Sequence, residues 1–278
     1  MMGGYDAALI DLDGTLVEGA DGLLEENIAA LRAAEARGKR VMIATGRSTI
    51  STRPVLERLG LETPAIVFNG AGLWCPRRGR MLEERILSGR TLARALDFGA
   101  HHGLMTILMA SELKWASPPT NAVEERALQG LKGLEIVSRD ELASKEFIVR
   151  VTLFSATHDA SERLMQEAEA HIRQPVYTTH FPLSVLHSHR ESPMSVIDIH
   201  APCRGKAEGL RVLRDMHGIP PGRVVAIGDA TNDLPMFAAA GLALATEDGM
   251  EEARRAAHQI IGKGGSAAIA RAIEEHLR

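Results

Sequence analysis

The chain is poor in cysteine, in surplus positive charge and in long apolar runs. Its two cysteines among 278 residues, Cys75 and Cys203, cannot build a disulfide framework or a metal–thiolate cluster. Its 32 basic residues are outnumbered by 36 acidic ones, so no excess of cations can neutralise a nucleic-acid backbone or an anionic membrane. No apolar run approaches the roughly 18 residues of a membrane-spanning helix, and the polar first residues lack the order of a signal peptide. We therefore expect a soluble cytoplasmic protein, monomeric or homodimeric, with neither nucleic acid nor membrane as a partner.

Apolar residues make up 45% of the chain, which is enough for a substantial core. At roughly 150 residues per domain, the length allows one large domain or two modest ones. Short apolar runs at 7–12, 41–44 and 65–68 each end in polar residues, and apolar residues at helical spacing lie between the first two runs. Buried strands that alternate with amphipathic helices are typical of a parallel sheet covered on both faces. The first part of the chain therefore predicts an α/β fold.

This alternation stops near residue 72. Residues 74–84 carry Pro76, Gly79 and three arginines, which indicates an exposed hairpin or linker. Beyond them the order of helices and strands no longer follows the first pattern, so we interpret residues 83–190 as an inserted α+β module. Its expected elements are helices at 91–101, 121–131 and 160–172 and strands at 105–109, 147–154, 176–181 and 184–189.

From residue 195 the first pattern returns. The run 196–199 predicts a strand of the core, and helix 206–217 and strand 224–227 follow it. We expect an open α/β core domain made of residues 1–82 and 191–278, interrupted by the inserted module.

Polar clusters follow the predicted core strands. They are Asp11-Leu12-Asp13-Gly14-Thr15, Thr45-Gly46-Arg47, Asn69-Gly70 and the segment from Gly228 to Asp233, with Lys206 at the start of a later helix. In open α/β sheets, ligands bind outside the carboxyl ends of the strands. We therefore expect these side chains to meet at one edge of the sheet.

Four aspartates in these clusters, Asp11, Asp13, Asp229 and Asp233, suggest a cation site. Two like charges near 4 Å repel by up to about 4 kcal/mol at an effective dielectric constant of 20, so converging carboxylates require a cation. Oxygen ligands of this kind suit Mg²⁺. A single Asp-Gly pair would be explained as a turn, but two acidic strand ends at one sheet edge favour the metal site over that explanation.

Hydrogen-bond donors accompany the carboxylates. A cation in the first turn of a helix opposes the helix dipole by roughly 0.3–1 kcal/mol, so Lys206 is either a solvated lysine or a phosphate-binding residue, and Arg204 could compete for that role. Thr45 and Gly46 offer a hydroxyl and an open backbone amide to a phosphoryl oxygen. Asn69-Gly70 is better explained as a turn.

These motifs, in this order, resemble those of the haloacid dehalogenase superfamily of phosphatases. Residues 11–16 resemble its first motif, Thr45-Gly46-Arg47 its second, Lys206 its third and residues 228–233 its fourth. The large insert between the second and third motifs is similar to that of the Cof-type subgroup (subfamily IIB). The resemblance implies a Rossmann-like core with an inserted α/β cap for substrate specificity. It also implies phosphatase activity toward sugar phosphates and other small phosphometabolites.

The resemblance also implies a role for each matching residue. Asp11 would attack phosphorus and become an aspartyl phosphate, and Asp13 would act as general acid and then general base. Mg²⁺ would be bound by Asp11, by the carbonyl of Asp13, by Asp229 and by Asp233 as ligand or outer partner. The phosphoryl group would be held by Thr45, Gly46, Lys206 and Asn232. Residues 241–249 and 262–265 depart from the family pattern, which affects the expected loop shape and substrate contacts.

Substrate contacts in the insert are less defined. Trp115, His180, His187, His189 and Arg190 are candidates, but packing or solvent exposure explains each of them as well. His101 and His102 lie near a predicted helix end, where capping explains them.

Three other functions remain open at this point. A phosphomutase would use the same nucleophile but transfer the phosphoryl group to a sugar. A phospho-accepting regulatory module carries paired acids at the first strand and its accepting Asp at a later one, and it is disfavoured here by the Asp-x-Asp pair at the first strand and by the cap-sized insert. A catalytically silent binding protein is disfavoured because no expected catalytic position is missing.

Overall fold

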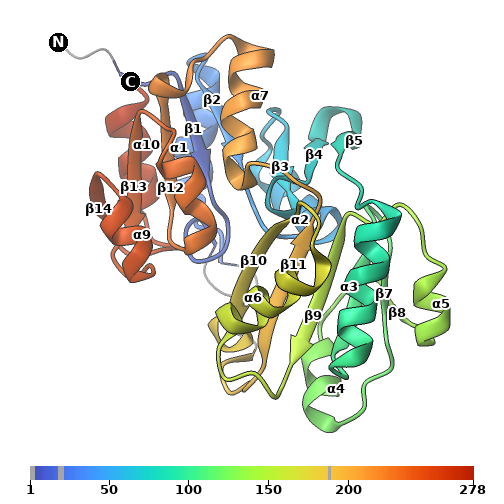
Figure 1. The fold of residues 1–278 in the computed structure, drawn as a ribbon. Coiled ribbons are helices and arrows are strands. Elements are labelled where there is room, and N and C mark those ends of the chain that lie inside the picture. Colours follow the sequence, from blue (N-terminus) through green and yellow to red (C-terminus); the bar gives the residue numbers. More distant parts are fainter. Residues whose placement is uncertain (1–3, 18–21, 187–188) are drawn as a thin grey trace. The chain divides into compact units, whose positions relative to one another are not determined.

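The computed structural model describes residues 4–17, 22–186 and 189–278, and the chain forms two compact units (Figure 1). The core unit comprises Met1–Glu83 and Arg204–Arg278, and the cap unit comprises Glu84–Cys203. The first boundary lies one residue from the predicted one. The second lies 13 residues later than predicted, at 203/204 instead of 190/191.

The core unit contains a five-stranded parallel sheet in the order β14-β13-β12-β1-β2, which confirms the predicted α/β fold. Its strands are β1 (Ala7–Ile10), β2 (Arg40–Ile43), β12 (Val224–Gly228), β13 (Leu242–Thr246) and β14 (Gln259–Ile261). All residues of the three inner strands β13, β12 and β1 are buried. Such continuous apolar strands are expected where helices cover both faces of a parallel sheet.

Helices cover this sheet on both faces (Figure 1). Leu9, Met42 and Ala226 point to one face, where they join a core with α7 (Glu208–His217), α8 (Leu234–Phe237) and α9 (Glu251–Ala256). On the other face α1 (Glu25–Ala36) packs against α10 (Ala268–His276), with α2 (Thr49–Leu59) beside α1. Buried Asn27 joins α1 to α10 by donating to the Ser266 carbonyl at 3.1 Å and accepting from the Ala270 amide at 3.0 Å.

The third apolar run forms β3 (Ala65–Val67), which contacts the parallel sheet through a single bridge between Ala44 and Ile66. It then enters a separate sheet with β4 (Gly72–Cys75) and β5 (Arg80–Glu84). β3 and β4 are antiparallel and are joined by the 3-10 turn Phe68–Gly70. A second 3-10 turn, Pro76–Arg78, joins β4 to β5 and confirms the predicted hairpin.

The cap unit contains a mixed sheet in the order β10-β11-β9-β6-β7-β8, which confirms an α+β module. Its strands are β6 (Met105–Met109), β7 (Lys114–Ala116), β8 (Leu134–Ile136), β9 (Arg150–Ser155), β10 (Tyr177–Pro182) and β11 (Ser195–His200). Its helices are α3 (Gly89–His101), α4 (Ala122–Leu128), α5 (Arg139–Ala143) and α6 (Ser161–Ile172).

Two predictions in this region are wrong. β11 was expected to return to the core sheet, but it pairs antiparallel with both β9 and β10. A continuous apolar run fits a buried strand of either sheet, so its pattern could not decide between them. A strand was also expected at 184–189, but the chain forms the 3-10 turn Leu183–Val185 there. Residues 187 and 188 of that range lie outside the described residues. Pro182 ends β10, and proline has no N–H to extend a ladder.

The two faces of the cap sheet differ in chemistry. Val151, Leu153, Ile197 and Ile199 join the apolar core formed with α3 and α6. Because side chains alternate along a strand, the intervening residues point to the opposite face. Those residues are Arg150, Thr152, Asp198 and His200, all of them buried. Asp198 accepts a hydrogen bond from Thr152 at 2.5 Å and pairs with Arg150 at 3.3 Å.

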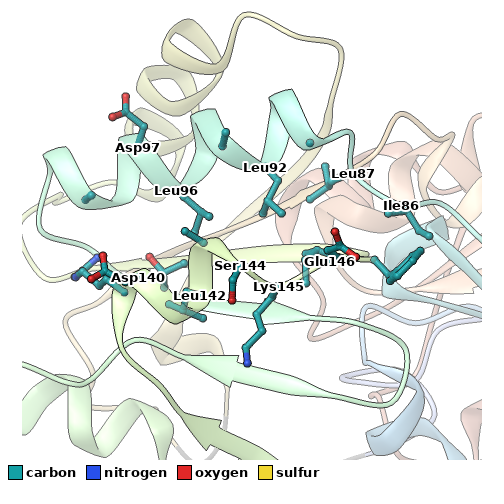
Figure 2. Close-up of a pocket in the computed structure, with 18 residues that line it drawn as sticks. Ile86, Leu87, Leu92, Leu96, Asp97, Asp140, Leu142, Ser144, Lys145 and Glu146 are labelled. Atoms are coloured by element: carbon teal, nitrogen blue, oxygen red, sulfur yellow. The ribbon is translucent and has the colours of Figure 1, made fainter.

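A cavity of about 870 Å³ lies between α3 and the segment around α5 (Figure 2). Figure 2 shows Leu92 and Leu96 of α3 pointing toward Leu142 and Ser144 on the opposite side. None of the site residues predicted from the sequence lines this cavity. No helix within the described residues is long and apolar enough to cross a membrane.

Acid should destabilise the fold through His200. Burial lowers the pKa of His200 to about 4; Asp198 opposes this shift and Arg150 adds to it. The unfolded chain, with a pKa near 6.5, binds the proton more readily, so stability is lost as the pH falls from about 6.5 to about 4. The loss attributable to His200 should reach up to about 3 kcal/mol.

Urea unfolding of the wild type and of His200→Gln across this pH range measures the effect. The variant should lose less unfolding free energy than the wild type on acidification, whereas His276→Gln, a control in the core unit, should follow the wild type. Identical pH dependence in all three proteins would contradict this account of His200.

Candidate active site

Two acidic residues meet at the edge of the core sheet because their strands are neighbours. Asp11 follows β1 and Asp229 follows β12, and these parallel strands pair in register up to Ile10 opposite Ile227. Asp233 lies on the 3-10 turn Thr231–Asp233 that comes next. One carboxylate oxygen from each of the three aspartates lies within 4.8 Å of the others.

Lys206 holds two of these carboxylates together. Its Nζ lies 2.6 Å from Asp11 Oδ1 and 2.7 Å from Asp233 Oδ1. The ammonium and both carboxylates are almost fully buried. Lys206 was predicted to lie in the first turn of an α-helix. It lies instead in the 3-10 turn Gly205–Ala207, which precedes α7.

The backbone before Lys206 is tightly constrained. Gly70 has φ +99°, and a Cβ there would lie 2.2 Å from the Gly205 carbonyl oxygen. Only glycine fits this conformation and contact. The turn after β3 therefore packs directly against the turn that carries Lys206.

The charges in this cluster do not balance. Burial raises the pKa of Asp11 well above its usual value, although Lys206 opposes the shift. Burial and then the neighbouring Asp233 raise the pKa of Asp229 to about 6, against the Thr15 hydroxyl and Lys206. Burial lowers the pKa of Lys206, but Asp11 and Asp233 outweigh it and the net shift is upward. Three carboxylates around one ammonium leave the site in need of further positive charge.

Asp233 has little capacity left for a metal ion. Its Oδ2 accepts hydrogen bonds from the amides of Asp229 at 2.9 Å and Ala230 at 3.0 Å, while Oδ1 accepts from Lys206. A carboxylate offers about four acceptor positions, of which three are used. Asp233 is therefore best placed to hold the Asp229 loop and Lys206 in position.

Asp13 lies apart from the three carboxylates. Its side chain is half exposed and forms a bidentate ion pair with Arg47, whose Nε lies 2.8 Å from Oδ2. Gly14, the next residue, has φ +79°, and a Cβ there would lie 2.4 Å from Asp229 Oδ2. The chain can therefore make this turn against Asp229 only with glycine. Arg47 belongs to the predicted second motif, but nothing in the sequence pattern indicates that it pairs with Asp13.

The expected phosphate-binding residues lie around Asn69. The Thr45 hydroxyl is buried and accepts from the Arg47 amide at 3.1 Å. A Cβ on Gly46 would lie 3.0 Å from Asn69 Oδ1, and Asn232 Nδ2 donates to that same oxygen at 3.1 Å. Asn232 Oδ1 is buried without a hydrogen-bond partner in the described part of the chain. These groups form a polar cluster in which Asn232 Oδ1 could accept a hydrogen bond from a donor on a ligand.

Asn69 and Thr15 lie in the site, although neither was assigned a role there from the sequence. Asn69 has φ 49°, which agrees with the predicted turn, yet its side chain also accepts a hydrogen bond from Asn232. Thr15 is fully buried and donates to Asp229 Oδ1 at 2.7 Å. Both belong to the sequence motifs, but a turn was sufficient to explain Asn69, and no separate role was expected of Thr15.

Comparison with known proteins agrees with this geometry. The family model described as haloacid dehalogenase-like hydrolase matches residues 8–273. The chain belongs to this family. A pyridoxal phosphate phosphatase of Escherichia coli is 28% identical over 284 residues, covering 96% of this chain and 97% of the relative. A 5-amino-6-(5-phospho-D-ribitylamino)uracil phosphatase of Bacillus subtilis is 24% identical over 278 residues, covering 96% of both chains.

Solved structures share the fold of this haloacid dehalogenase-like chain. A sugar phosphatase of subclass IIB superposes with a TM-score of 0.79 at 20% identity, covering 97% of this chain and 98% of the other. A phosphatase from Bacteroides thetaiotaomicron superposes with a TM-score of 0.80 at 19% identity, covering 98% and 95%. The chain is thus a hydrolase of the haloacid dehalogenase-like family, as the four motifs predicted.

The region that departs from the haloacid dehalogenase pattern still supports the first motif. The Gly265 amide donates to the Thr15 carbonyl at 2.8 Å. The Gly264 amide donates to Asp248 Oδ1 at 2.9 Å, and a Cβ on Gly264 would collide with the Gly14 carbonyl. The two segments that depart from the family pattern, 241–249 and 262–265, therefore bind each other, and the second also contacts the first motif.

The candidate substrate contacts in the cap have local explanations. Trp115 packs in the cap core with the Lys145 ammonium 5.0 Å from its ring, and His180 Nδ1 lies 3.1 Å from Ser161 Oγ. His189 and Arg190 line a hollow next to α4. His187 lies outside the described residues.

Removing the buried ammonium should be costly. Lys206→Met leaves Asp11 and Asp233 buried without their partner, so we expect a loss of about 3–5 kcal/mol of unfolding free energy in metal-free buffer. Urea denaturation measures it. Lys263→Met, at an exposed position of the same unit, is the matched control and should cost little.

A double-mutant cycle with Asp233→Asn separates this interaction from lost packing. Lys206→Met should cost less in the Asp233→Asn background than in the wild type, since one buried charge is already gone. Equal costs in the two backgrounds would show that the ion pair carries no coupling energy.

Proposed function

We propose that the chain is a Mg²⁺-dependent cytoplasmic phosphatase that hydrolyses small phosphate monoesters through an aspartyl phosphate on Asp11. One observation carries the proposal: a buried carboxylate at a strand end, bound by Lys206 and grouped with Asp229 and Asp233. The relatives named above act on pyridoxal phosphate, on a phosphoribitylamino uracil and on sugars, by their names. Those names support a sugar phosphate or a similar phosphometabolite as the substrate class.

The residues at the site fit Mg²⁺. All the offered ligands are oxygens, the donor type that Mg²⁺ prefers, and the carboxylates outnumber the ammonium between them. Asp11, the Asp13 carbonyl and Asp229 would hold the ion, with Asp233 fixing the loop that carries Asp229. When bound, the ion supplies charge that offsets the carboxylates and the phosphoryl oxygens.

Asp11 is the nucleophile in this proposal. Its oxygen forms a bond to phosphorus while the bond from phosphorus to the ester oxygen breaks, and the leaving alcohol takes a proton from Asp13. Water then attacks the aspartyl phosphate, Asp13 accepts its proton, and Asp11 is released together with inorganic phosphate. Acid and base roles alternate on one residue, as a two-step route requires.

The ion pair with Arg47 restricts proton donation by Asp13. In the bidentate contact both carboxylate oxygens accept hydrogen bonds from Arg47, whereas the first step needs one of these oxygens to donate a proton to the leaving group. Asp13 must therefore turn away from Arg47 before it can donate a proton. Its half-exposed position leaves room for that movement.

Thr45, Gly46, Lys206 and Asn232 would hold the transferring phosphoryl group. The Thr45 hydroxyl already accepts one hydrogen bond, so its proton is available to a phosphoryl oxygen. Lys206 and the Gly46 and Asn232 amides supply further donors. Charge neutralisation and positioning provide most of the catalysis in phosphoryl transfer, so this set is chemically sufficient.

We also propose that the cap unit sets substrate specificity. Polar side chains of Arg150, Thr152 and Asp198 gather on the sheet face opposite its helices. Trp115 of β7 packs on the sheet face that the helices cover. Because side chains alternate along a strand, its neighbour Lys114 points to the opposite, polar face. Burial and then Arg150 lower the pKa of Lys114 to about 8, which leaves it largely protonated at neutral pH. This face suits an anionic or hydroxyl-rich leaving group.

Phosphate release from a panel of small phosphometabolites, with and without Mg²⁺, tests the reaction. We expect Mg²⁺-dependent release of free phosphate, and a kcat lowered by at least about three orders of magnitude in Asp11→Asn. Asp215→Asn, at an exposed carboxylate of α7, should behave as the wild type. Full activity in Asp11→Asn would rule out Asp11 as the nucleophile, and an isomerised sugar in place of free phosphate would identify a phosphomutase.

Replacing Lys114 tests the role of the cap. Lys114→Met should change the ratio of kcat/KM between anionic metabolites and an aryl phosphate by about tenfold, because one charge–charge contact is worth roughly 1.4 kcal/mol. Lys132→Met, at an exposed cap position, should leave the ratio unchanged. If both variants lower the rates for all substrates equally, the polar face has no part in selection.

A further inference from the structure

A second group of metal-ligating side chains lies within the cap unit. His102 follows the last turn of α3, His158 lies in the loop between β9 and α6, and Glu167 lies on α6. One ligand atom from each residue lies within 4.8 Å of the others. The proposed phosphatase reaction uses none of the three.

The spacing of two of these atoms matches that of ligands on one ion. His158 Nε2 lies 3.2 Å from Glu167 Oε2. Two ligands with zinc bonds of about 2.0–2.2 Å in tetrahedral geometry lie about 3.3–3.5 Å apart. The observed separation lies within about 0.2 Å of that range, and it is also the length of the hydrogen bond that joins the two atoms.

The other polar side-chain atoms of His158 and Glu167, which would not bind the metal, form hydrogen bonds with neighbouring residues. His158 Nδ1 lies 2.7 Å from Ser155 Oγ, and buried Ser155 also accepts from the amides of Thr157 at 3.2 Å and His158 at 3.1 Å. Glu167 Oε1 accepts from Arg163 Nε at 3.0 Å. Metal-binding histidines and carboxylates are typically oriented by such outer hydrogen bonds. The opposite atoms, His158 Nε2 and Glu167 Oε2, hydrogen-bond to each other, and a metal ion between them would replace the shared proton.

His102 completes the group. Its ring packs at a tilt against Phe98 with centroids 4.4 Å apart and lies 6.1 Å from the His158 ring. This packing holds the His102 ring beside the ring of His158.

We propose that His102, His158 and Glu167 bind a Zn²⁺ ion, with water as the fourth ligand, and that this ion joins the end of α3 to α6. Imidazole nitrogens favour zinc and its neighbours in the transition series over Mg²⁺, so this site differs in chemistry from the all-oxygen site of the core unit. Three protein ligands leave one position open, unlike the four of a closed structural zinc site.

Zinc binding by the untagged full-length protein tests the proposal. Competition with a chromophoric chelator in excess Mg²⁺ measures the affinity. We expect His102→Gln and His158→Gln each to weaken binding by about 100-fold or more, and Ser155→Ala by about 10–100-fold through loss of the outer hydrogen bond. His276→Gln removes a histidine from the core unit and should leave the affinity unchanged. Zinc should also raise the melting temperature of the wild type but not that of His158→Gln.

Two further variants separate the outcomes. Glu167→Gln keeps the side-chain shape but offers a poorer ligand, so it should weaken zinc binding without loss of fold, as judged by circular dichroism. Asp229→Asn should retain this zinc. Zinc that is lost in Asp229→Asn but kept in the histidine variants would assign the ion to the core unit and overturn the proposal. Absence of zinc uptake would also overturn it and leave a plain histidine–carboxylate hydrogen bond.

Discussion

The contact of the Lys206 ammonium with Asp11 and Asp233 is the interaction on which the site depends. It joins the end of β1 to the turn after β12 inside a region that water does not reach. A buried ammonium is tolerated only beside carboxylates, and buried carboxylates only beside a cation. The glycines around it serve this contact: Gly70 lets the turn after β3 approach Gly205, and Gly228 leaves space for the Asp233 carboxylate. The same charges that make the cluster stable also leave it short of one cation, which is why we assign Mg²⁺ to it.

Much of this arrangement could be predicted from the sequence, for a topological reason. In a parallel sheet the carboxyl ends of all strands lie on one edge, so residues as distant as Asp11 and Asp229 are neighbours whatever the chain does between them. The apolar runs identified the strands of that sheet, and the polar residues after them identified the edge. The first boundary of the insert was readable because the hairpin 74–84 breaks the alternation of strands and helices. These features depend on local pattern alone.

What could not be predicted depends on partners that leave no local pattern. The run 196–199 is a buried strand in either sheet, and only its antiparallel partners β9 and β10 assign β11 to the cap. Arg47 and Asn69 were explained by a motif and a turn, but their contacts with Asp13 and Asn232 follow from the spatial arrangement. The His102, His158 and Glu167 group is the extreme case. Its members come from a helix end, a loop and a second helix, without the regular spacing that marks a metal site in a sequence.

The central claim is that Asp11 becomes covalently phosphorylated during turnover. Borohydride reduction of enzyme quenched during turnover of a small phosphate monoester, followed by peptide mass spectrometry, tests it most directly, since an acyl phosphate is reduced to the alcohol. The account predicts homoserine at position 11, in a yield that requires both substrate and Mg²⁺. An unmodified Asp11 in enzyme that is turning over, or homoserine at Asp13 or Asp229 instead, would contradict it.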